Sequence, residues 1–484
     1  MDSELGFHSL RTETKERVSV EGSLPDWLTG SLIRNGPGTF NFPDGNAVDH
    51  WFDGLAMLSR FSFIPDDQQI LFQNRFLQTD SFKSARRGDF DGGFATGQTT
   101  LRARLKTFFS EPYDNTNIIT ERIGNSFYAL TESPRSVEFD PRTLEMKGHF
   151  EYDGEVPTGQ LHCAHYKRDP ATGSLIAVDT EFGRTSKYHI YAIESPQDRS
   201  HIASVETEKP AYMHSLGLTP QYVILTEFPL RLNPLQFLKP GTQEAFIQQF
   251  DWEPTRGTVV HLVDRTTGTV KASPVLEPLF GFHHVNAYES NNGQTVVFDI
   301  ETVPDDSSIE SLYLENLRAG QLGSLAGKLR RVTIELAPET ESRYGPEAPK
   351  TTTEVIYDDG TALPTVSPAQ WNRKHRYIYA MSLDEPITEW ATAVMKHDIE
   401  QDTTAEFAGV CDYFTEPIFV PSPEAEHQDS GVVIVVGLDV STEHSHLVVL
   451  DGSSFTLRAH SQLPVALPFD FHGRYFPNIR AQSA

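Results

Sequence analysis

Short runs of aliphatic and aromatic residues, each followed by a turn signal, recur along the whole chain. They are roughly five residues long and rich in β-branched and aromatic side chains, which is typical of strands. Examples lie at 126–130, 175–178, 188–191, 222–225, 257–263, 376–380, 431–436 and 446–450. Many end in turns, such as Asp264-Arg265-Thr266-Thr267-Gly268 after the run 257–263. The pattern predicts an all-β fold of the sandwich, barrel or propeller kind.

The length of 484 residues distinguishes between these architectures. One hydrophobic core rarely grows beyond roughly 250 to 300 residues, so the chain needs several domains or a ring of repeated sheets. Pro and Gly are spread in short turns, and no stretch of them reads as a linker. We therefore predict a single domain over residues 1–484. A β-propeller is favoured over a sandwich because of the length, although no tight sequence repeat is visible.

Two segments differ from the strand pattern. Periodic leucines predict a helix over residues 309–329, on one face of the ring. Residues 228–238 form an apolar segment with two prolines, which suits neither a helix nor a central strand. This segment is either a packed surface loop or an apolar rim that contacts a membrane.

The formal net charge of −27 limits the possible partners. A surface of this charge repels phosphate backbones, which argues against a nucleic-acid partner. Dispersed carboxylates also suit concentrated salt, because salt screens their mutual repulsion. We therefore favour a halophilic protein, the alternative being an ordinary acidic cytosolic one.

The remaining compositional features concern the compartment. Cys163 and Cys411 are the only cysteines, too few for a disulfide framework or a thiolate metal site. Residues 1–6 are acidic and lack the basic and apolar regions of a signal peptide. The longest aliphatic run, 432–438, is too short to cross a bilayer. We expect a cytoplasmic protein, with the 228–238 segment as the candidate for peripheral membrane contact.

Four of the 18 histidines, His165, His214, His283 and His472, stand beside aromatic or small residues and ahead of, or within, a predicted strand. Their separations of 49, 69 and 189 residues exclude a local ligand motif, so they could meet only where several strands converge, as on a propeller axis. The pair His283-His284 could equally be two core histidines bonded to backbone. An all-imidazole site suits iron, copper or zinc, and the spacing does not choose between these metals.

Two longer motifs carry a family resemblance. Residues 49–57 read Asp-His-Trp-Phe-Asp-Gly-Leu-Ala-Met, and residues 282–289 read Phe-His-His-Val-Asn-Ala-Tyr-Glu. With the four histidine segments, they resemble the carotenoid cleavage oxygenase family, in particular its animal branch of β-carotene oxygenases and the retinoid isomerase. The resemblance runs from the region of residue 20 to the last of the four histidines. It implies a seven-bladed β-propeller with a dome of loops and helices that encloses an apolar tunnel.

The resemblance also implies the metal and its ligands. It places one iron(II) ion per chain on the propeller axis, held by His165, His214, His283 and His472. These four residues are thus both the expected metal ligands and the expected catalytic centre.

In that family, glutamates accept hydrogen bonds from three of the four ligand imidazoles, which fixes the tautomer and orientation of each ring. The resemblance assigns Glu132 to His214 and Glu416 to His472. Both are expected to act from the second shell of the metal.

The third glutamate is expected immediately before the Leu-Pro pair at 363–364, where this chain has Ala362. His283 is therefore expected to lack this carboxylate, so that water or a carboxylate from elsewhere takes its ring N–H. Loss of such a partner typically costs roughly tenfold to a hundredfold in metal affinity or activity. A weakened or altered iron site is one expectation.

The resemblance implies that dioxygen, as cosubstrate, and an alkene meet at the iron, and that C=C cleavage gives two carbonyl products, usually aldehydes. In resembling enzymes that split hydroxystilbenes, a lysine that binds the phenol precedes the first supporting glutamate. Here that residue is Thr131, which offers no cation for a phenolate. A carotenoid or apocarotenoid is therefore the favoured substrate. Besides Thr131, four apolar residues beside the motifs are expected to bind it, unless they are plain core: Phe52, Phe282, Leu363 and Phe471.

Three functions remain open. The first is an iron dioxygenase that cleaves a carotenoid or apocarotenoid. The second is a retinoid-type isomerase or hydrolase, or a hydroxystilbene-cleaving dioxygenase, on the same iron. The third is a non-catalytic propeller that binds an apolar ligand or a protein partner. Oxygen dependence separates the first from the isomerase, and metal analysis separates both from the third.

The charge pattern leads to a first prediction. On transfer from molar salt to low salt, the protein is expected to unfold, because unscreened carboxylates repel one another. Circular dichroism across a salt series would measure this. A signal that does not change with salt would favour the ordinary acidic protein.

Overall fold

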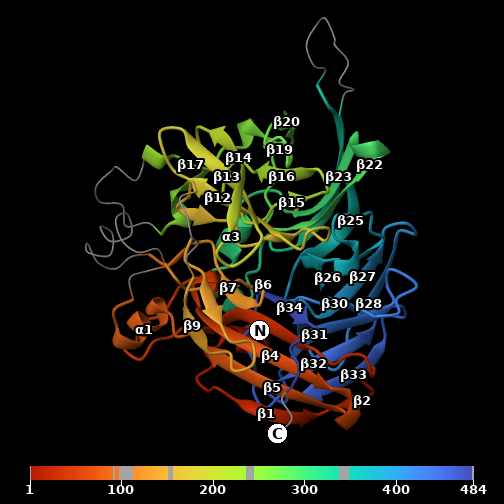
Figure 1. Ribbon diagram of the computed structural model, residues 1–484. Coiled ribbons are helices and arrows are strands. Elements are labelled where there is room, and N and C mark those ends of the chain that lie inside the picture. The colour runs from red at the N-terminus through yellow and green to blue at the C-terminus, as the bar shows by residue number, and fades with distance from the viewer. Residues whose placement is uncertain are drawn as a thin grey trace, which may run out of the picture.

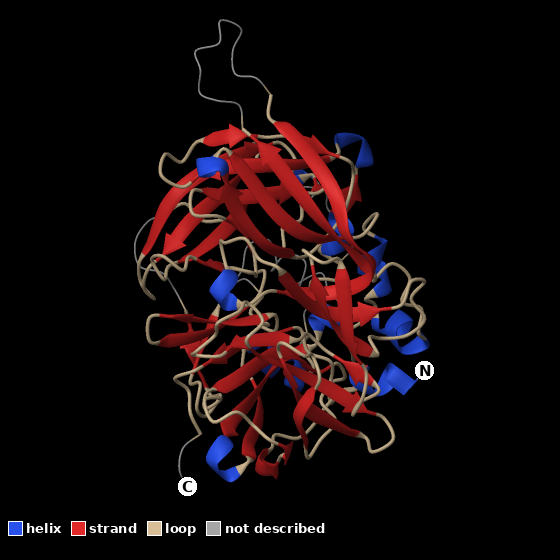
Figure 2. Ribbon diagram, turned by 90° about the vertical axis from the view of Figure 1, so that its right-hand side faces the viewer, coloured by secondary structure: helices blue, strands red, loops and turns tan. Residues whose placement is uncertain are grey.

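The computed structural model describes residues 2–90, 93–97, 113–150, 156–235, 245–336 and 348–481. In these ranges strands dominate, and helices are few and short (Figures 1 and 2). The sheets surround a central axis as a seven-bladed β-propeller in which no sheet is closed. The predicted fold class is confirmed.

The sheets follow the chain in order around the ring, except that the first and the last each contain strands from both ends of the chain. The first sheet contains β1 (Lys15–Ser19), β5 (Gln69–Phe76), β4 (Leu55–Ile64), β3 (Ser31–Thr39) and β34 (His472–Phe476). The second contains β6 (Ile119–Ile123), β7 (Ser126–Leu130), β8 (Val137–Phe139) and β9 (Met146–His149). The third contains β10 (Leu161–His162), β11 (Lys167–Arg168), β12 (Leu175–Glu181), β13 (Ser186–Ile193) and β14 (Arg199–Thr207). The fourth contains β15 (Gly217–Leu218), β16 (Tyr222–Glu227), β19 (Thr258–Asp264), β20 (Val270–Ala272) and β21 (Val275–Leu276).

The second half of the ring is built from two larger sheets. A seven-stranded sheet contains β22 (His284–Ser290), β23 (Thr295–Thr302), β24 (Gly327–Glu335), β25 (Lys350–Thr365), β26 (Tyr377–Leu383), β27 (Ala393–Asp398) and β28 (Thr403–Phe407). The last contains β2 (Glu21–Gly22), β33 (Leu457–Gln462), β32 (His444–Asp451), β31 (Gly431–Asp439), β29 (Tyr413–Phe414) and β30 (Ile418–Pro421).

The long strand β25 belongs to two blades. Its residues up to Thr361 pair with β24, and those from Gly360 onward pair with β26. The register shifts between Ala362 and Thr365, which bends the strand where the partner changes. The seven-stranded sheet therefore supplies two of the seven blades.

Both ends of the chain close the ring. The C-terminal strand β34 pairs with β3, with His472 opposite Asn35. The N-terminal strand β2 pairs with β33, with Glu21 opposite His460. One end of the chain thus completes the sheet begun by the other.

The predicted strands are found where the apolar runs lie. Residues 126–130 form β7, and 431–436 lie within β31, which is buried along nearly its whole length. Continuous apolar runs of this kind mark strands covered on both faces. Neighbouring blades supply that cover here.

The predicted helix over 309–329 does not form as one element. Two short helices, α3 (Ser307–Ser311) and α4 (Leu314–Ala319), replace it. Tyr313 between them takes an extended conformation and forms a bridge with His50, which interrupts the helical hydrogen bonds. Gly320 then ends α4 in the left-handed region, at φ 68°.

The 228–238 segment is described as far as Leu235, and residues 236–238 lie outside the described ranges. Leu230–Leu232 form strand β17, which pairs with β18 (Phe250–Trp252). Phe228, Leu230 and Leu232 are buried, whereas Leu235 is 61% exposed. The described part is therefore mostly packed, and membrane contact through this segment stays a prediction. No helix in the described ranges is long and apolar enough to span a membrane.

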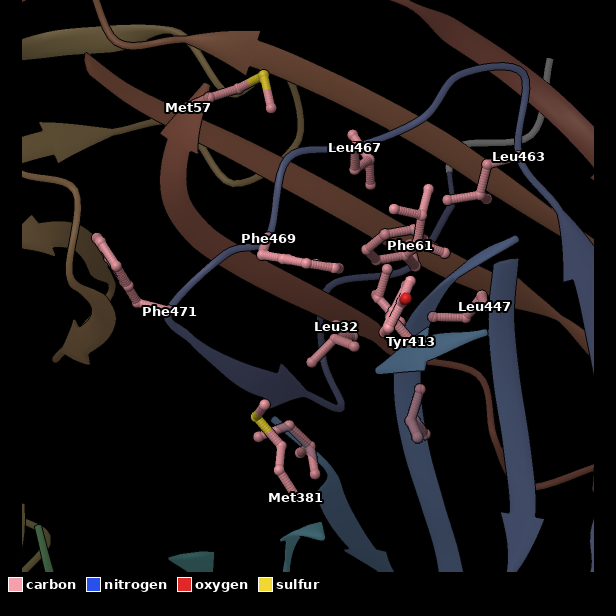
Figure 3. Close-up of a cluster of buried hydrophobic side chains, with 14 of the residues drawn as sticks. Leu32, Met57, Phe61, Met381, Tyr413, Leu447, Leu463, Leu467, Phe469 and Phe471 are labelled. Atoms are coloured by element: carbon pink, nitrogen blue, oxygen red, sulfur yellow. The ribbon is translucent and has the colours of Figure 1, made fainter. Parts of the chain in front are cut away.

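The largest apolar cluster lies between the first and last sheets and extends to the axis. Figure 3 shows Phe469 and Phe471 on the segment that leads into β34. The Phe469 ring stacks on Trp390 at 4.9 Å, and the Phe471 ring meets Trp51 edge-on at 4.4 Å. The residues just before His472 therefore pack into the core, and β34, which begins at His472, closes the ring.

A buried arginine connects β3 to the segment before β34 and to Glu416, and it gives a second prediction. Arg34 on β3 donates to Asp470 at 2.9 Å and to the Glu416 carboxylate at 3.0 Å, and its side chain is 1% exposed. Replacing it (Arg34→Leu) leaves two buried carboxylates without their cation, which typically costs about 3–5 kcal/mol of unfolding free energy.

Urea unfolding would measure this loss. Arg17→Leu is the matched control on β1, the edge strand of the same sheet, because Arg17 pairs with Asp67 at the surface. Its loss is expected to cost less than about 1 kcal/mol. Equal losses in the two variants would contradict the role given to Arg34.

Candidate active site

Each of the four predicted histidines lies at the start of a strand near the axis. His165 precedes β11, His214 precedes β15, His283 precedes β22, and His472 is the first residue of β34. These strands belong to four different sheets. One ring nitrogen from each histidine lies within 4.8 Å of the others, and the measured separations between ring centroids are 4.3–5.3 Å. The structure therefore brings the four rings to one point.

The ring nitrogens of this cluster are suited to a metal ion. Nε2 of His165 and Nε2 of His283 are buried and have no hydrogen-bond partner in the protein. Burial, followed by the neighbouring rings and cations, holds the pKa of His165, His283 and His472 well below its usual range. Neutral imidazoles with free lone pairs are ligands for iron, copper or zinc. Nitrogens about 2.1 Å from one ion lie within about 4.2 Å of each other, which is compatible with the upper limit of 4.8 Å on the separations in this cluster.

Glu132 orients His214. Its Oε1 accepts a 2.5 Å hydrogen bond from Nδ1 of His214 and a 2.6 Å bond from the Tyr212 hydroxyl. Because Nδ1 carries the proton, the lone pair of Nε2 is free to face the cluster. The glutamate lies just after β7 and so joins the second sheet to the fourth.

Glu416 has the same relation to His472. Oε1 accepts from Nδ1 of His472 at 2.8 Å, while Oε2 accepts from the Gly473 N–H and from Arg34, both at 3.0 Å. Burial raises the pKa of Glu416 to about 7, although Arg34 acts in the opposite direction. A metal cation on the ring would also favour the carboxylate form.

His283 does not lack a carboxylate, which corrects the expectation drawn from Ala362. Glu301 on β23 accepts from Nδ1 of His283 at 3.0 Å. The N–H of Leu363 donates to the same carboxyl group, whose pKa burial raises to about 8. Gly327 makes room for it, since a Cβ there would lie 2.7 Å from Glu301 Cγ. The carboxylate therefore comes from β23, and Ala362 forms part of the cavity wall instead.

A sequence signal for Glu301 did exist. The N–H of Glu301 donates to the carbonyl of His283 at 3.0 Å, so the two residues lie opposite each other in one hairpin. The apolar run 296–300 in the sequence ends just before Glu301. Fixing the register of this hairpin would have located the glutamate beside His283.

The adjacent His284 is a core histidine, the alternative considered for the pair His283-His284. Its ring lies on the opposite side of the strand, within 2.8 Å of the hydroxyls of both Ser215 and Thr226. Burial lowers the pKa of His284 to about 3. Both of its ring nitrogens have a hydrogen-bond partner. Its ring points away from the cluster because neighbouring strand residues point to opposite faces.

An apolar cavity begins at the histidine cluster. Its volume is about 880 Å³, including its opening to solvent, and His214, His283 and His472 form part of its wall. The predicted substrate residues Phe52, Phe282, Leu363 and Phe471 also line it. Thr131 is buried but is not among the lining residues. Whether the four lining residues bind substrate stays a prediction.

The motif at residues 50–54 holds one side of this cavity. Trp51 and Phe52 line it, and the indole N–H of Trp51 donates to the Phe469 carbonyl at 3.2 Å. Asp53 is fully buried and accepts the backbone N–H groups of residues 94–96 at 2.6–2.9 Å. The motif therefore fixes both a wall of the cavity and the segment beside it.

A second group of possible ligands, Asp80, Asp114 and His149, lies away from the axis. Asp114 is already used by the N–H groups of Asp80 and Ser81, and Arg135 lies 3.5 Å from Asp80. The group is explained by these contacts as a structural ion cluster.

The sequence matches a family model described as "Retinal pigment epithelial membrane protein" over residues 7–477. The chain belongs to this family, that of the carotenoid cleavage oxygenases. The predicted family is thereby confirmed.

Members of this carotenoid cleavage oxygenase family with curated names are similar over almost the full length. Beta,beta-carotene 15,15'-dioxygenase of Mus musculus is 29% identical, over 98% of this chain and 92% of that protein. Carotenoid cleavage dioxygenase 8, chloroplastic, of Arabidopsis thaliana is 28% identical, over 98% and 86%. Among solved structures, an ACO/RPE65 chimera superposes with a TM-score of 0.85 at 25% identity, covering 98% of both chains. Cobalt-substituted Synechocystis ACO gives 0.84 at 24% identity, over 98% of both chains.

Glu301 gives a third prediction. Glu301→Ala is expected to weaken iron binding by roughly tenfold to a hundredfold, because the His283 ring loses the acceptor that orients it. Competition with a chelator would measure the affinity. Glu277→Ala, which removes only a surface carboxylate paired with Arg330, is the control and should bind iron normally.

A double variant tests whether the position of the carboxylate matters. In Glu301→Ala/Ala362→Glu, a carboxylate enters from β25, the strand on which the family resemblance expects it. Recovery of iron affinity above that of Glu301→Ala is the expected result. A double variant as weak as the single one would show that β23 alone can support His283.

Proposed function

We propose that the protein is a non-haem iron(II) dioxygenase that cleaves a C=C double bond of a carotenoid or apocarotenoid with O2 into two carbonyl products, aldehydes in the ordinary case. The observation that supports this most is the position of four clustered imidazoles at the head of an apolar cavity. The curated names of the relatives, carotenoid dioxygenases from mouse and Arabidopsis thaliana, agree with it.

The proposal assigns the metal to His165, His214, His283 and His472. Bound iron(II) would supply coordination positions at which dioxygen is activated. The protein would hold the proton of three rings on Nδ1, through Glu132, Glu301 and Glu416, and so keep the other nitrogen free as a ligand. Only His165 lacks such a glutamate among the described contacts.

The cavity wall supports a long apolar substrate. Phe52, Phe282 and Phe471 line the same cavity as His214, His283 and His472, where their rings would exclude water and pack against a flat polyene. Among the described lining residues there is no Lys or Arg. A phenolate, as in a hydroxystilbene, would find no cation there, which favours a polyene.

Product analysis provides the fourth prediction and tests the proposal. Iron-loaded protein in high salt, given oxygen and a panel of polyenes, is expected to yield paired carbonyl products identified by mass. Reaction under ¹⁸O₂ should label these products, and anaerobic incubation should stop the reaction. Metal-free protein is the control.

Other outcomes would identify the competing functions. A changed double-bond geometry or a released alcohol without oxygen would indicate an isomerase or hydrolase. Cleavage of a stilbene alone would indicate the phenolic substrate class. A protein that retains no iron and converts nothing would fit the non-catalytic ligand-binding propeller.

A further inference from the structure

Nearly every polar side chain in the cavity wall is occupied by a partner within the protein. The indole N–H groups of Trp51 and Trp390 donate to the carbonyls of Phe469 and Phe414. The Thr302 hydroxyl accepts from Arg330 at 3.0 Å. The ligand histidines in the wall are held by glutamates. These groups leave a ligand few polar contacts.

The hydroxyl of Ser308 is different. Ser308 lines the cavity and is 2% exposed, and its Oγ meets no hydrogen-bond partner in the protein. A buried hydroxyl without a partner is unfavourable, because it has lost water and gained nothing in return. Among the described lining residues it is the only side-chain hydroxyl left without a partner.

The position of Ser308 is fixed by the 50–54 motif. His50 Nδ1 accepts the N–H of Phe52 at 3.1 Å, so the ring proton lies on Nε2. Nε2 therefore donates to the Ile309 carbonyl, also at 3.1 Å. Burial lowers the pKa of His50 to about 4, which keeps the ring neutral in this role. The motif thus holds the backbone next to Ser308 in place.

We propose that Ser308 is a specificity-determining residue whose hydroxyl bonds an oxygen atom of the substrate. The preferred substrate is then a polyene with a hydroxyl or carbonyl group at one end, rather than a pure hydrocarbon. This inference rests on the proposed function and narrows its substrate class. The oxygen could belong to a terminal aldehyde or alcohol, or to a ring hydroxyl or ketone, since one hydroxyl can serve either as donor or as acceptor.

Binding can be measured without turnover. Trp51 and Trp390 line the cavity, so a bound polyene should quench their fluorescence. Iron-loaded protein under anaerobic conditions is titrated with three polyenes of matched length: a hydrocarbon, a terminal aldehyde and a ring alcohol. The wild type should bind at least one oxygenated polyene about threefold to tenfold more tightly than the hydrocarbon, the effect of one net hydrogen bond. The preferred polyene then reveals which oxygen is bound.

Ser308→Ala should remove this preference and leave hydrocarbon binding unchanged. It should also unfold at the same temperature as the wild type or higher, because no internal hydrogen bond is lost. Ser311→Ala is the matched control in the same helix: its hydroxyl contacts the Ser307 carbonyl and the Ser324 N–H and does not line the cavity. This control should keep the preference of the wild type.

Two results would overturn the inference. One is a wild type that binds all three polyenes equally, which would mean that water satisfies the hydroxyl. The other is a Ser308→Ala variant that weakens all three equally, which would indicate a packing role. If the preference is found but no polyene is cleaved under oxygen, the proposed function fails while the binding role of Ser308 stands.

Discussion

The hydrogen bonds between buried glutamates and ring nitrogens are the interaction on which the centre depends. Without an acceptor on Nδ1, an imidazole is free to change its tautomer and turn its lone pair away from the axis. Glu132 and Glu416 each accept a hydrogen bond from a histidine that belongs to a different sheet. Glu301 accepts one from His283 within a single hairpin. Glu132 and Glu416 therefore connect different sheets around the axis, in addition to orienting the rings.

Much of the fold follows from local sequence. Runs such as 126–130 and 431–436 are strands in the structure because they are apolar, β-branched and closed by turns. The leucines of 309–329 misled the prediction for a physical reason. Leu312, Leu314 and Leu317 are buried, so their spacing reports contact with the core, but the bridge between Tyr313 and His50 interrupts the helix. Burial can be read from such a pattern, whereas a tertiary bridge cannot.

The site was less accessible to sequence reasoning. The spacing of the histidines along the chain does not show which of the 18 lie together in the fold. The family motifs were needed to select these four. The structure then places them together, but their assignment to iron stays a proposal. Glu301 was missed because its role depends on hairpin register, which the apolar run did not fix. The free hydroxyl of Ser308 is a property of its surroundings, so no pattern of residues could have revealed it.

The ring closure has a consequence for how the protein is made. His472 belongs to β34, the strand that completes the first sheet by pairing with β3. During synthesis, His472 leaves the ribosome after the other three histidines, so the fourth ring cannot reach the axis until β34 has been made. Blades formed earlier offer at most three of the imidazoles. Under the proposed function, binding of iron by all four rings would therefore follow the docking of β34, and a nascent chain without this strand cannot hold the complete ligand set.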